Sequence, residues 1–188
     1  DGSSQLIAKT GYSRIGGFEI YLSRPELGSS LWETILEAGR SENIRPGSPN
    51  IIDRVEAGLL SFGNEMTVEN TPLECNMDKF LDINKEADYI GKKVLQRQIR
   101  YGIKRRIRGI IYNGPKLPTI SRPLQVFDID KRTIVGSLTS GAFSPHFKRN
   151  IGVGMIKYGY WDNNKKILVN IADQEFREGL IKDLPLVQ

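Results

Sequence analysis

The second half of the chain consists of short alternating or apolar runs at close spacing, and these runs limit the possible folds more than any other feature. Glycine, proline, asparagine and aspartate separate them, as expected for strands joined by turns. Six short strands of this kind predict an antiparallel barrel or sandwich. The runs are "RIRGIIY" (106–112), "PLQVFD" (123–128), "TIVGSLTS" (133–140), "IGVGMIKYG" (151–159), "KILVNIA" (166–172) and "QEFREG" (174–179).

The first half of the chain mixes strand and helix patterns. Two strands are predicted around a glycine-rich turn, and three helices follow, the last of which ends at Gly102. A polar loop rich in turn formers separates the second helix from the third. We therefore expect an α+β chain, in which residues 1–103 form one part and residues 104–188 form an all-β domain. The predicted strands cover 5–9 and 18–22, and the predicted helices cover 29–40, 49–59 and 90–101. The second helix has Ser48 as its N-cap and Pro49 at its first helical position.

Length and composition are those of an ordinary globular protein. The chain has 188 residues, of which 39% are hydrophobic and 26% are charged. No apolar run approaches the roughly 18 residues that a membrane helix needs, so no membrane partner is expected. Cys75 is the only cysteine, and a reducing compartment, the cytoplasm, is therefore expected. The single histidine, His146, excludes a multi-histidine metal site, and no metal is expected.

Residues 91–109 carry much of the excess positive charge. This stretch, "GKKVLQRQIRYGIKRRIRG", is rich in lysine and arginine and contains no acid. Nucleic acid and a small anionic ligand are two kinds of partner for such a run. A solvated helix face followed by an edge strand is the third interpretation, and it is the one we favour. Nucleic acid is therefore not the expected partner.

Five motifs are spread over about 150 residues of the chain. They are "AKTGYSRIGGFEIYL" (8–22), "DRVEAGLLSFGNEM" (53–66), "TPLEC" (71–75), "DYIGKKVL" (88–95) and "VGSLTSGAFSPHFKRNIGVGMI" (135–156). In this order they resemble the folate-dependent methyl and aminomethyl transferases related to the glycine cleavage T-protein. The resemblance implies that the end of a folate-binding α/β core is followed by a six-stranded antiparallel β-barrel.

The turn before Glu19 distinguishes two branches of that family. Aminomethyltransferases usually have an acidic pair in this turn, whereas residues 13–17 read Ser-Arg-Ile-Gly-Gly. The chain therefore resembles the dimethylsulfoniopropionate demethylases more than the aminomethyltransferases. Family members are longer, and the matched region is their C-terminal half. The aspartate that aminomethyltransferases use catalytically lies in the other half. We therefore assign no catalytic residue, and we expect the missing N-terminal half of the same protein to be a partner.

The resemblance implies four cofactor-binding residues, Tyr12, Glu19, Tyr21 and Arg54. Glu19 matches the family's pterin-binding glutamate, and a carboxylate can accept two charge-assisted hydrogen bonds from the adjacent N–H and amine of the ring. The tyrosines would line the same pocket, and Arg54 would bind the carboxylates of the folate tail. Residue type alone leaves ordinary alternatives open: an exposed acid, packing of the two tyrosines, and an intrahelical or capping ion pair at Arg54.

The implied reaction transfers a methyl group from a small-molecule sulfonium donor to N5 of tetrahydrofolate. Three alternatives stay open: an aminomethyltransferase acting on a lipoyl carrier protein, a folate-binding module without catalysis, and a basic nucleic-acid-binding barrel. The sequence also leaves open the oligomeric state, with a homodimer among the alternatives, and whether this length of chain is active alone.

Overall fold

The computed structural model describes residues 4–12, 16–48 and 50–187, which belong to two compact units. The first unit comprises Asp1–Asn50 and the second comprises Ile51–Gln188. Among the described residues, only the second unit contains fully buried side chains.

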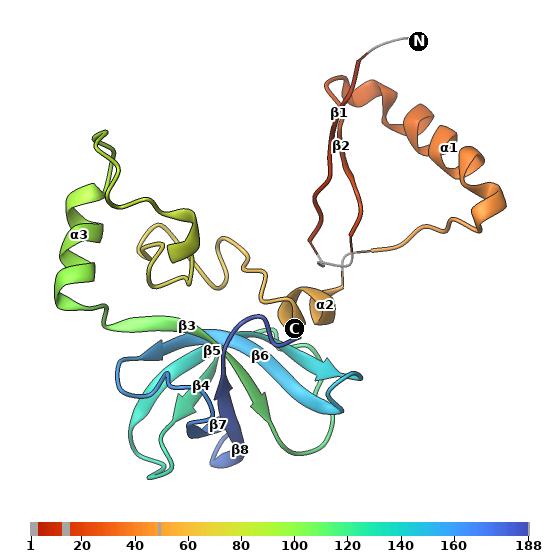
Figure 1. Ribbon diagram of the computed structural model, residues 1–188. Helices are drawn as coiled ribbons and strands as arrows, with labels where there is room; N and C mark the ends of the chain where they lie inside the picture. Colours follow the sequence, from red (N-terminus) through yellow and green to blue (C-terminus); the bar gives the residue numbers. More distant parts are fainter. Residues whose placement is uncertain (1–3, 13–15, 49, 188) are drawn as a thin grey trace. The chain divides into compact units, whose positions relative to one another are not determined.

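Six antiparallel strands close into a barrel in the second unit (Figure 1). Their order around the barrel is β3-β6-β5-β4-β7-β8. Each of the six predicted runs forms one strand, so the α+β class with a six-stranded antiparallel barrel is confirmed. The strands are β3 (Arg105–Tyr112), β4 (Leu124–Phe127), β5 (Ile134–Ser144), β6 (Arg149–Lys157), β7 (Lys166–Ala172) and β8 (Glu175–Lys182).

Aliphatic side chains and one tyrosine form the main core of the barrel. Ile110 and Tyr112 of β3 are 0% and 1% exposed, and their spacing of two residues places them on the same face. Burial raises the pKa of Tyr112 to about 12, because a low-dielectric interior disfavours the phenolate. The buried members of this core are Ile110, Tyr112, Val126, Val135, Leu138, Ile156, Ile167, Val169 and Ile181.

A short helix, α2 (Ile51–Glu56), packs against β5 and β6. Val55 is fully buried and joins Ile107, Ile151 and Val153 in a second cluster. The helix ends before the predicted end at Leu59, and its predicted first residue, Pro49, lies outside the described residues. It ends because Gly58 takes a left-handed conformation with φ +68°, and the Leu59 N–H then bonds back to the Arg54 carbonyl.

Strands β5 and β6 approach each other so closely that several of their residues have to be glycine. A Cβ on Gly154 would overlap the carbonyl oxygen of Ser137 and lie 2.7 Å from the Cα of Leu138. The register of β5 against β6 shifts between Leu138 and Ser140, which marks a bulge beside this contact. Bulges and glycines together let a strand bend sharply, as closure of a small barrel requires.

We predict that Gly154→Ala destabilises the barrel by roughly 1–3 kcal/mol, because the added methyl group has no space and the backbone has to move. Urea unfolding followed by circular dichroism measures the change. Gly47→Ala is the matched control, because nothing lies within 4 Å of a Cβ built on Gly47. Equal midpoints for the two variants would contradict the close approach of β5 and β6.

The first unit contains a β-hairpin and one helix. Strand β1 (Leu6–Ala8) pairs with β2 (Glu19–Tyr21), as the predicted strands 5–9 and 18–22 require. Helix α1 (Gly28–Ala38) follows, flanked by the short 3-10 helices η1 (Pro25–Leu27) and η2 (Arg40–Glu42). The predicted helix over 29–40 is confirmed, with its start one residue earlier.

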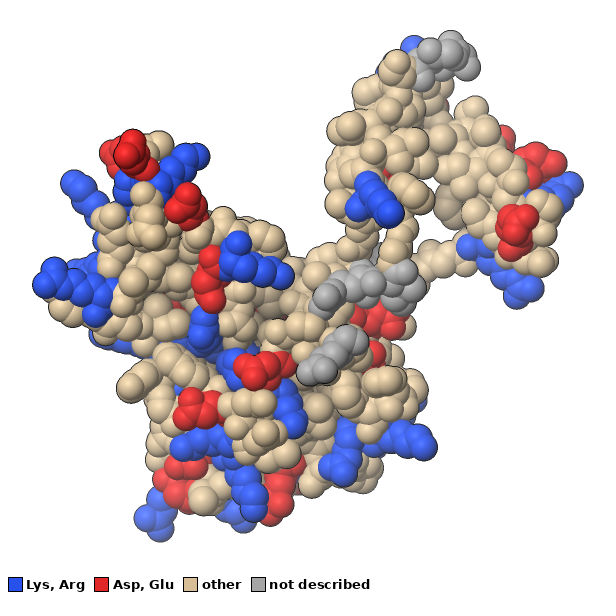
Figure 2. Space-filling view, viewed as in Figure 1, with Lys and Arg blue, Asp and Glu red and all other residues tan. Residues whose placement is uncertain are grey.

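The hairpin exposes apolar side chains on both of its faces. Leu6 lies opposite Tyr21 on one face, and Ile7 lies opposite Ile20 on the other. Leu6 is 67% exposed, Ile7 58% and Tyr21 53%. Figure 2 shows mostly uncharged surface over this hairpin. A two-stranded hairpin without a covered face is only marginally stable, so these surfaces are suited to packing against further polypeptide.

A third helix, α3 (Lys92–Tyr101), lies between the loop region 57–91 and the barrel. Gly91 and Gly102, with φ +89° and +84°, bound it, which confirms the predicted end at Gly102. Lys and Arg side chains gather over α3 in Figure 2. The boundary predicted near residue 103 lies between α3 and β3, and it stays a prediction. The loop region also contains the 3-10 helix η3 (Asp78–Phe80).

Among the helices of the described residues, none has the length and apolarity needed to cross a membrane.

Candidate functional site

Glu19 is the first residue of β2, and its carboxylate is exposed. The Thr10 hydroxyl donates a hydrogen bond to Oε2 of Glu19. Thr10 continues the face of β1 that carries Ala8, and Ala8 lies directly opposite Glu19. Within the described part of the chain, Oε1 has no protein partner, so the carboxylate is oriented by one neighbour and retains capacity for external donors.

Two predicted tyrosines lie in the same hairpin as Glu19. Tyr21 is two residues along β2, so its side chain leaves the strand on the same face as Glu19. Tyr12 follows β1 and is 46% exposed. The hairpin therefore brings Glu19 and Tyr21 together on one surface. The turn residues Ser13, Arg14 and Ile15 lie outside the described residues. They belong to the turn whose lack of an acidic pair distinguishes the demethylase-like branch from the aminomethyltransferases.

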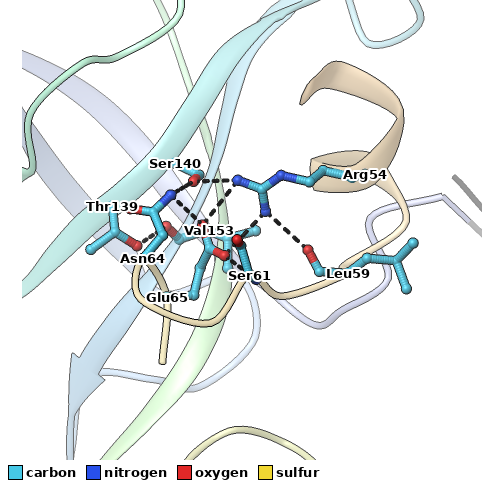
Figure 3. A network of polar contacts seen from close by, with 8 residues as sticks. All are labelled: Arg54, Leu59, Ser61, Asn64, Glu65, Thr139, Ser140 and Val153. Carbon is cyan, nitrogen blue, oxygen red and sulfur yellow. Dashed lines mark hydrogen bonds and ion pairs between the residues drawn. The ribbon is translucent and has the colours of Figure 1, made fainter. Parts of the chain in front are cut away.

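Arg54 belongs to the second unit and lies in a buried network (Figure 3). Its side chain is 10% exposed, and that of its partner Glu65 is 0% exposed. The guanidinium donates from Nη1 to Oε2 of Glu65 at 3.1 Å and from Nη2 to Oε1 at 3.2 Å, which forms a bidentate ion pair. Nη1 also donates to the Leu59 carbonyl at 3.0 Å, and Nη2 to the Ser140 hydroxyl at 2.6 Å.

These contacts use all four terminal N–H donors of Arg54. The sequence left open an intrahelical or capping ion pair at Arg54. The observed ion pair is not intrahelical, because Glu65 lies on a loop after α2. The prediction that Arg54 binds the folate tail stays a prediction, and only the Nε–H donor is left outside these four contacts.

Three side chains of the Arg54 network were not identified from the sequence: Asn64, Glu65 and Ser140. The Asn64 amide donates to Ser140 at 2.6 Å and to Glu65 at 3.2 Å, and the Ser61 N–H donates to Glu65 at 2.6 Å. A buried arginine requires a carboxylate partner, but several glutamates follow it and nothing in their spacing selects Glu65. Ser140 faces the network at the β5 bulge, which a strand pattern does not reveal.

We predict that Arg54→Met destabilises the protein by about 3–5 kcal/mol, because it leaves the buried Glu65 carboxylate without its counter-charge. Adding Glu65→Gln should recover part of this loss, so that a double-mutant cycle gives a coupling of about 1 kcal/mol or more. Denaturant unfolding provides the four free energies.

Arg106→Met serves as the control for that cycle, because Arg106 and its partner Asp78 are 31% and 51% exposed. Its cost should stay within about 1 kcal/mol. Strictly additive effects of the Arg54 and Glu65 substitutions would refute the energetic importance of the bidentate pair.

Cys75 and His146 are the other residues whose chemistry suggests a catalytic role. Cys75 is 4% exposed, and burial, followed by the charge of Glu74, raises the pKa of its thiol. His146 is exposed and packs edge-on against Phe147 at 4.9 Å between ring centroids. No cluster of three or more metal-ligating side chains occurs within the residues that the structure describes.

We predict that Cys75 is inert in the folded protein, because both its burial and its raised pKa keep it from presenting a thiolate. Labelling with an aromatic disulfide reagent at pH 8 should be slower than in urea by on the order of 100-fold, since it requires local opening. Cys75→Ala should remove the labelling and leave the far-ultraviolet circular dichroism unchanged. Rapid labelling of the native chain would show an accessible, reactive thiol instead.

Two domains of one protein family match almost the whole chain. Residues 1–85 match the GCVT N-terminal domain, and residues 105–186 match the glycine cleavage T-protein C-terminal barrel domain. The second match covers the barrel strands in full. The chain belongs to the glycine cleavage T-protein family. The family predicted from the five motifs is therefore confirmed.

Relatives of two kinds share this similarity. The dimethylsulfoniopropionate demethylase DmdA of Ruegeria pomeroyi is 41% identical over 160 residues, which are 85% of this chain and 43% of the relative. An aminomethyltransferase of Caldanaerobacter subterraneus is 37% identical over 182 residues, covering 96% of this chain and 47% of the relative. An aminomethyltransferase of a Geobacillus strain is 34% identical over 183 residues, 96% of this chain and 49% of the relative. The chain thus spans about half the length of the curated relatives that it matches.

A solved structure has the same fold. The crystal structure of the glycine cleavage system aminomethyltransferase T from Bartonella henselae aligns with a TM-score of 0.80 and 23% sequence identity. The alignment covers 96% of this chain and 49% of that protein. At this identity the likeness supports the fold alone.

Proposed function

We propose that the chain is the C-terminal part of a tetrahydrofolate-dependent methyltransferase. In this proposal a methyl group moves from a sulfonium donor, of the dimethylsulfoniopropionate type, to N5 of tetrahydrofolate. The observation that carries the proposal is the carboxylate of Glu19, which Thr10 orients on a strand and whose Oε1 has no protein partner among the described residues. The 41% identity to a dimethylsulfoniopropionate demethylase supports the choice of donor.

The binding step follows from the chemistry of a pterin ring. Such a ring presents a ring N–H and an exocyclic amine side by side, and both can donate to one carboxylate. The position of Glu19 within a hydrogen-bonded strand pair limits the side chain to a small volume, which lowers the entropy cost of binding. Tyr21 on the same face and Tyr12 beyond β1 are proposed to cover the ring with their aromatic surfaces.

The proposed transfer is an in-line displacement. The lone pair of N5 forms the new C–N bond, the C–S bond breaks with its electrons on sulfur, and the sulfonium leaves as a neutral thioether. The N5 proton passes to solvent. Because the leaving group is neutral, little acid catalysis is required, and holding the two reactants in line supplies most of the acceleration. This agrees with a site for which we propose binding residues and assign no catalytic group.

Arg54 has a structural role within the second unit in our proposal. Its ion pair with Glu65 and its bond to Ser140 connect α2, the 59–65 loop and β5. A rigid connection of this kind would hold the loop that carries Asn64 and Glu65 in one conformation. Direct contact of Arg54 with the folate tail remains the second possibility, and it would use Nε.

An aminomethyltransferase is the alternative function. Relatives with that name are 33–37% identical and match 94–98% of this chain. Ammonia is a poorer leaving group than a thioether, so that reaction depends more on a positioned acid. The Ser-Arg-Ile-Gly-Gly turn at residues 13–17 lacks the acidic pair that is usual in aminomethyltransferases, which favours the sulfonium donor.

Further polypeptide is part of the proposal. Relatives carry about as much chain again, and the hairpin of the first unit exposes Leu6, Ile7 and Tyr21. We propose that the N-terminal half of the same protein covers these residues and completes the folate pocket. The lone cysteine fits a reducing compartment, so we place the activity in the cytoplasm.

We predict that Glu19→Gln weakens tetrahydrofolate binding by about tenfold or more, because an amide offers the pterin only one acceptor oxygen and loses the charge. Calorimetry of the protein at its natural length, under anaerobic conditions, measures the affinity. Glu26→Gln, another acid of the first unit, is the matched control and should bind normally.

Activity assays with two donors separate the alternatives. Methyl transfer from dimethylsulfoniopropionate would support the demethylase type, whereas turnover only with an aminomethyl-lipoyl carrier protein would assign the aminomethyltransferase. Unchanged tetrahydrofolate affinity of Glu19→Gln would refute the assigned role of Glu19 in either case.

A further inference from the structure

A cavity of about 480 Å³ lies on the outer wall of the barrel. Strands β3, β7 and β8 form its floor, and the connection between β4 and β5 overhangs it. None of its lining residues belongs to the Arg54 network, although Ile111 also packs against the cluster that contains Val55 of α2. We call it the lateral cavity.

The floor of the lateral cavity is aliphatic. Leu180 of β8 lies between Ile111 of β3 and Lys166 of β7, and these cross-strand partners share one face of the sheet. Leu168 of β7 is two residues from Lys166 and therefore adds to the same face. Ile129 of the β4–β5 connection extends the apolar surface and is 65% exposed. An alkyl group could lie on these side chains without meeting an aromatic ring.

Four cations surround this floor: Lys131, Arg149, Lys166 and Lys182. One acid, Glu178, also lines the cavity, so the lining has a net positive charge. Within the described parts of the chain, none of the four cations forms an ion pair with a carboxylate.

The contacts of these cations orient the charges without neutralising them. Lys182 donates to the Asn164 side-chain oxygen at 2.6 Å, and Arg149 donates to that of Asn113. Lys131 lies over the Phe176 ring at 5.8 Å. Lys166 is directly opposite Leu180, at the junction of the charged and apolar surfaces. The positive charge is therefore available to an external anion.

We propose that the lateral cavity binds a small amphipathic carboxylate with an unbranched alkyl chain. Its volume falls in the range of small-molecule sites, roughly 300–1,000 Å³. The alkyl chain would cover Ile111, Leu168 and Leu180, and the carboxylate would accept charge-assisted hydrogen bonds from Lys166 and Lys182. This site is independent of the folate proposal, because it shares none of the residues assigned there.

Calorimetry with three eight-carbon probes tests the charge requirement. Octanoate should bind the full chain in a saturable manner, about tenfold or more tightly than octan-1-ol, because only the carboxylate gains charge-assisted hydrogen bonds. Octylammonium should not bind, since the rim repels it. Lengthening the alkyl chain of the probe from hexanoate to octanoate should tighten binding by about fourfold for each added methylene group. Equal binding of the alcohol and the acid, or no saturable binding of octanoate, would overturn the proposal.

Charge reversal on the rim tests the location. The double substitution Lys166→Glu and Lys182→Glu should weaken octanoate binding by about tenfold or more. The double substitution Lys104→Glu and Lys157→Glu, which changes the net charge equally outside the cavity, should leave it within about twofold. Equal losses in the two variants would show a non-specific attraction by the net charge and would refute the site.

Methyl nuclear magnetic resonance provides a measurement that does not depend on variants. Octanoate should shift the methyl signals of Ile111, Leu168 and Leu180, and should leave those of Val94 and Ile99, on α3, unchanged. Shifts elsewhere on the barrel, without shifts at these three residues, would place the ligand outside the lateral cavity and contradict the proposal.

Discussion

The ion pair between Arg54 and Glu65 is the interaction on which the arrangement of the second unit depends. It connects a short helix, a loop and a barrel strand. Secondary structure alone fixes little of this arrangement, since α2 has only six residues and the loop has little regular structure. Two buried charges impose a high cost unless every donor and acceptor is matched. Ser61, Asn64 and Ser140 supply those matches, so the geometry of the loop and the position of the β5 bulge are determined together.

The barrel provides the rigid frame for this network. Close contact between β5 and β6 requires glycine at positions such as Gly154, and the adjacent bulge directs Ser140 toward Arg54. The wall formed by β3, β7 and β8 has a different surface. There Ile111, Leu168 and Leu180 form an aliphatic floor, and the lysines of β7 and β8 also line the lateral cavity. One fold thus supports two surfaces of different chemistry.

The first unit contrasts with the barrel. It has a regular hairpin and helix, yet among its described residues none is fully buried. The strands of the hairpin pair with each other through backbone hydrogen bonds, whereas their apolar side chains are exposed. The residues proposed to bind the pterin, Glu19 and Tyr21, lie on this uncovered surface. A binding role and a role in packing against further chain are compatible here, because a folate pocket needs walls on both sides of the ring.

Local patterns were sufficient for most of the fold. All six barrel strands, the hairpin and the helices α1 and α3 agree with their predicted ranges to within a few residues, because alternation and turn residues act over short distances. The predicted second helix extends too far toward the C-terminus, since a left-handed Gly58 follows the end of α2 at Glu56. The motif order also predicted the family correctly.

The sequence by itself determined the strand pattern, the family and the presence of an acid at position 19 beside a glycine turn. Only the tertiary structure decided which carboxylate pairs with Arg54, because Glu65 and Ser140 are 11 and 86 residues away and their proximity follows from barrel closure. It also decided that the lysines of β7 and β8 meet above an aliphatic floor. Periodicity assigns residues to faces, but strand order and register decide which faces become neighbours.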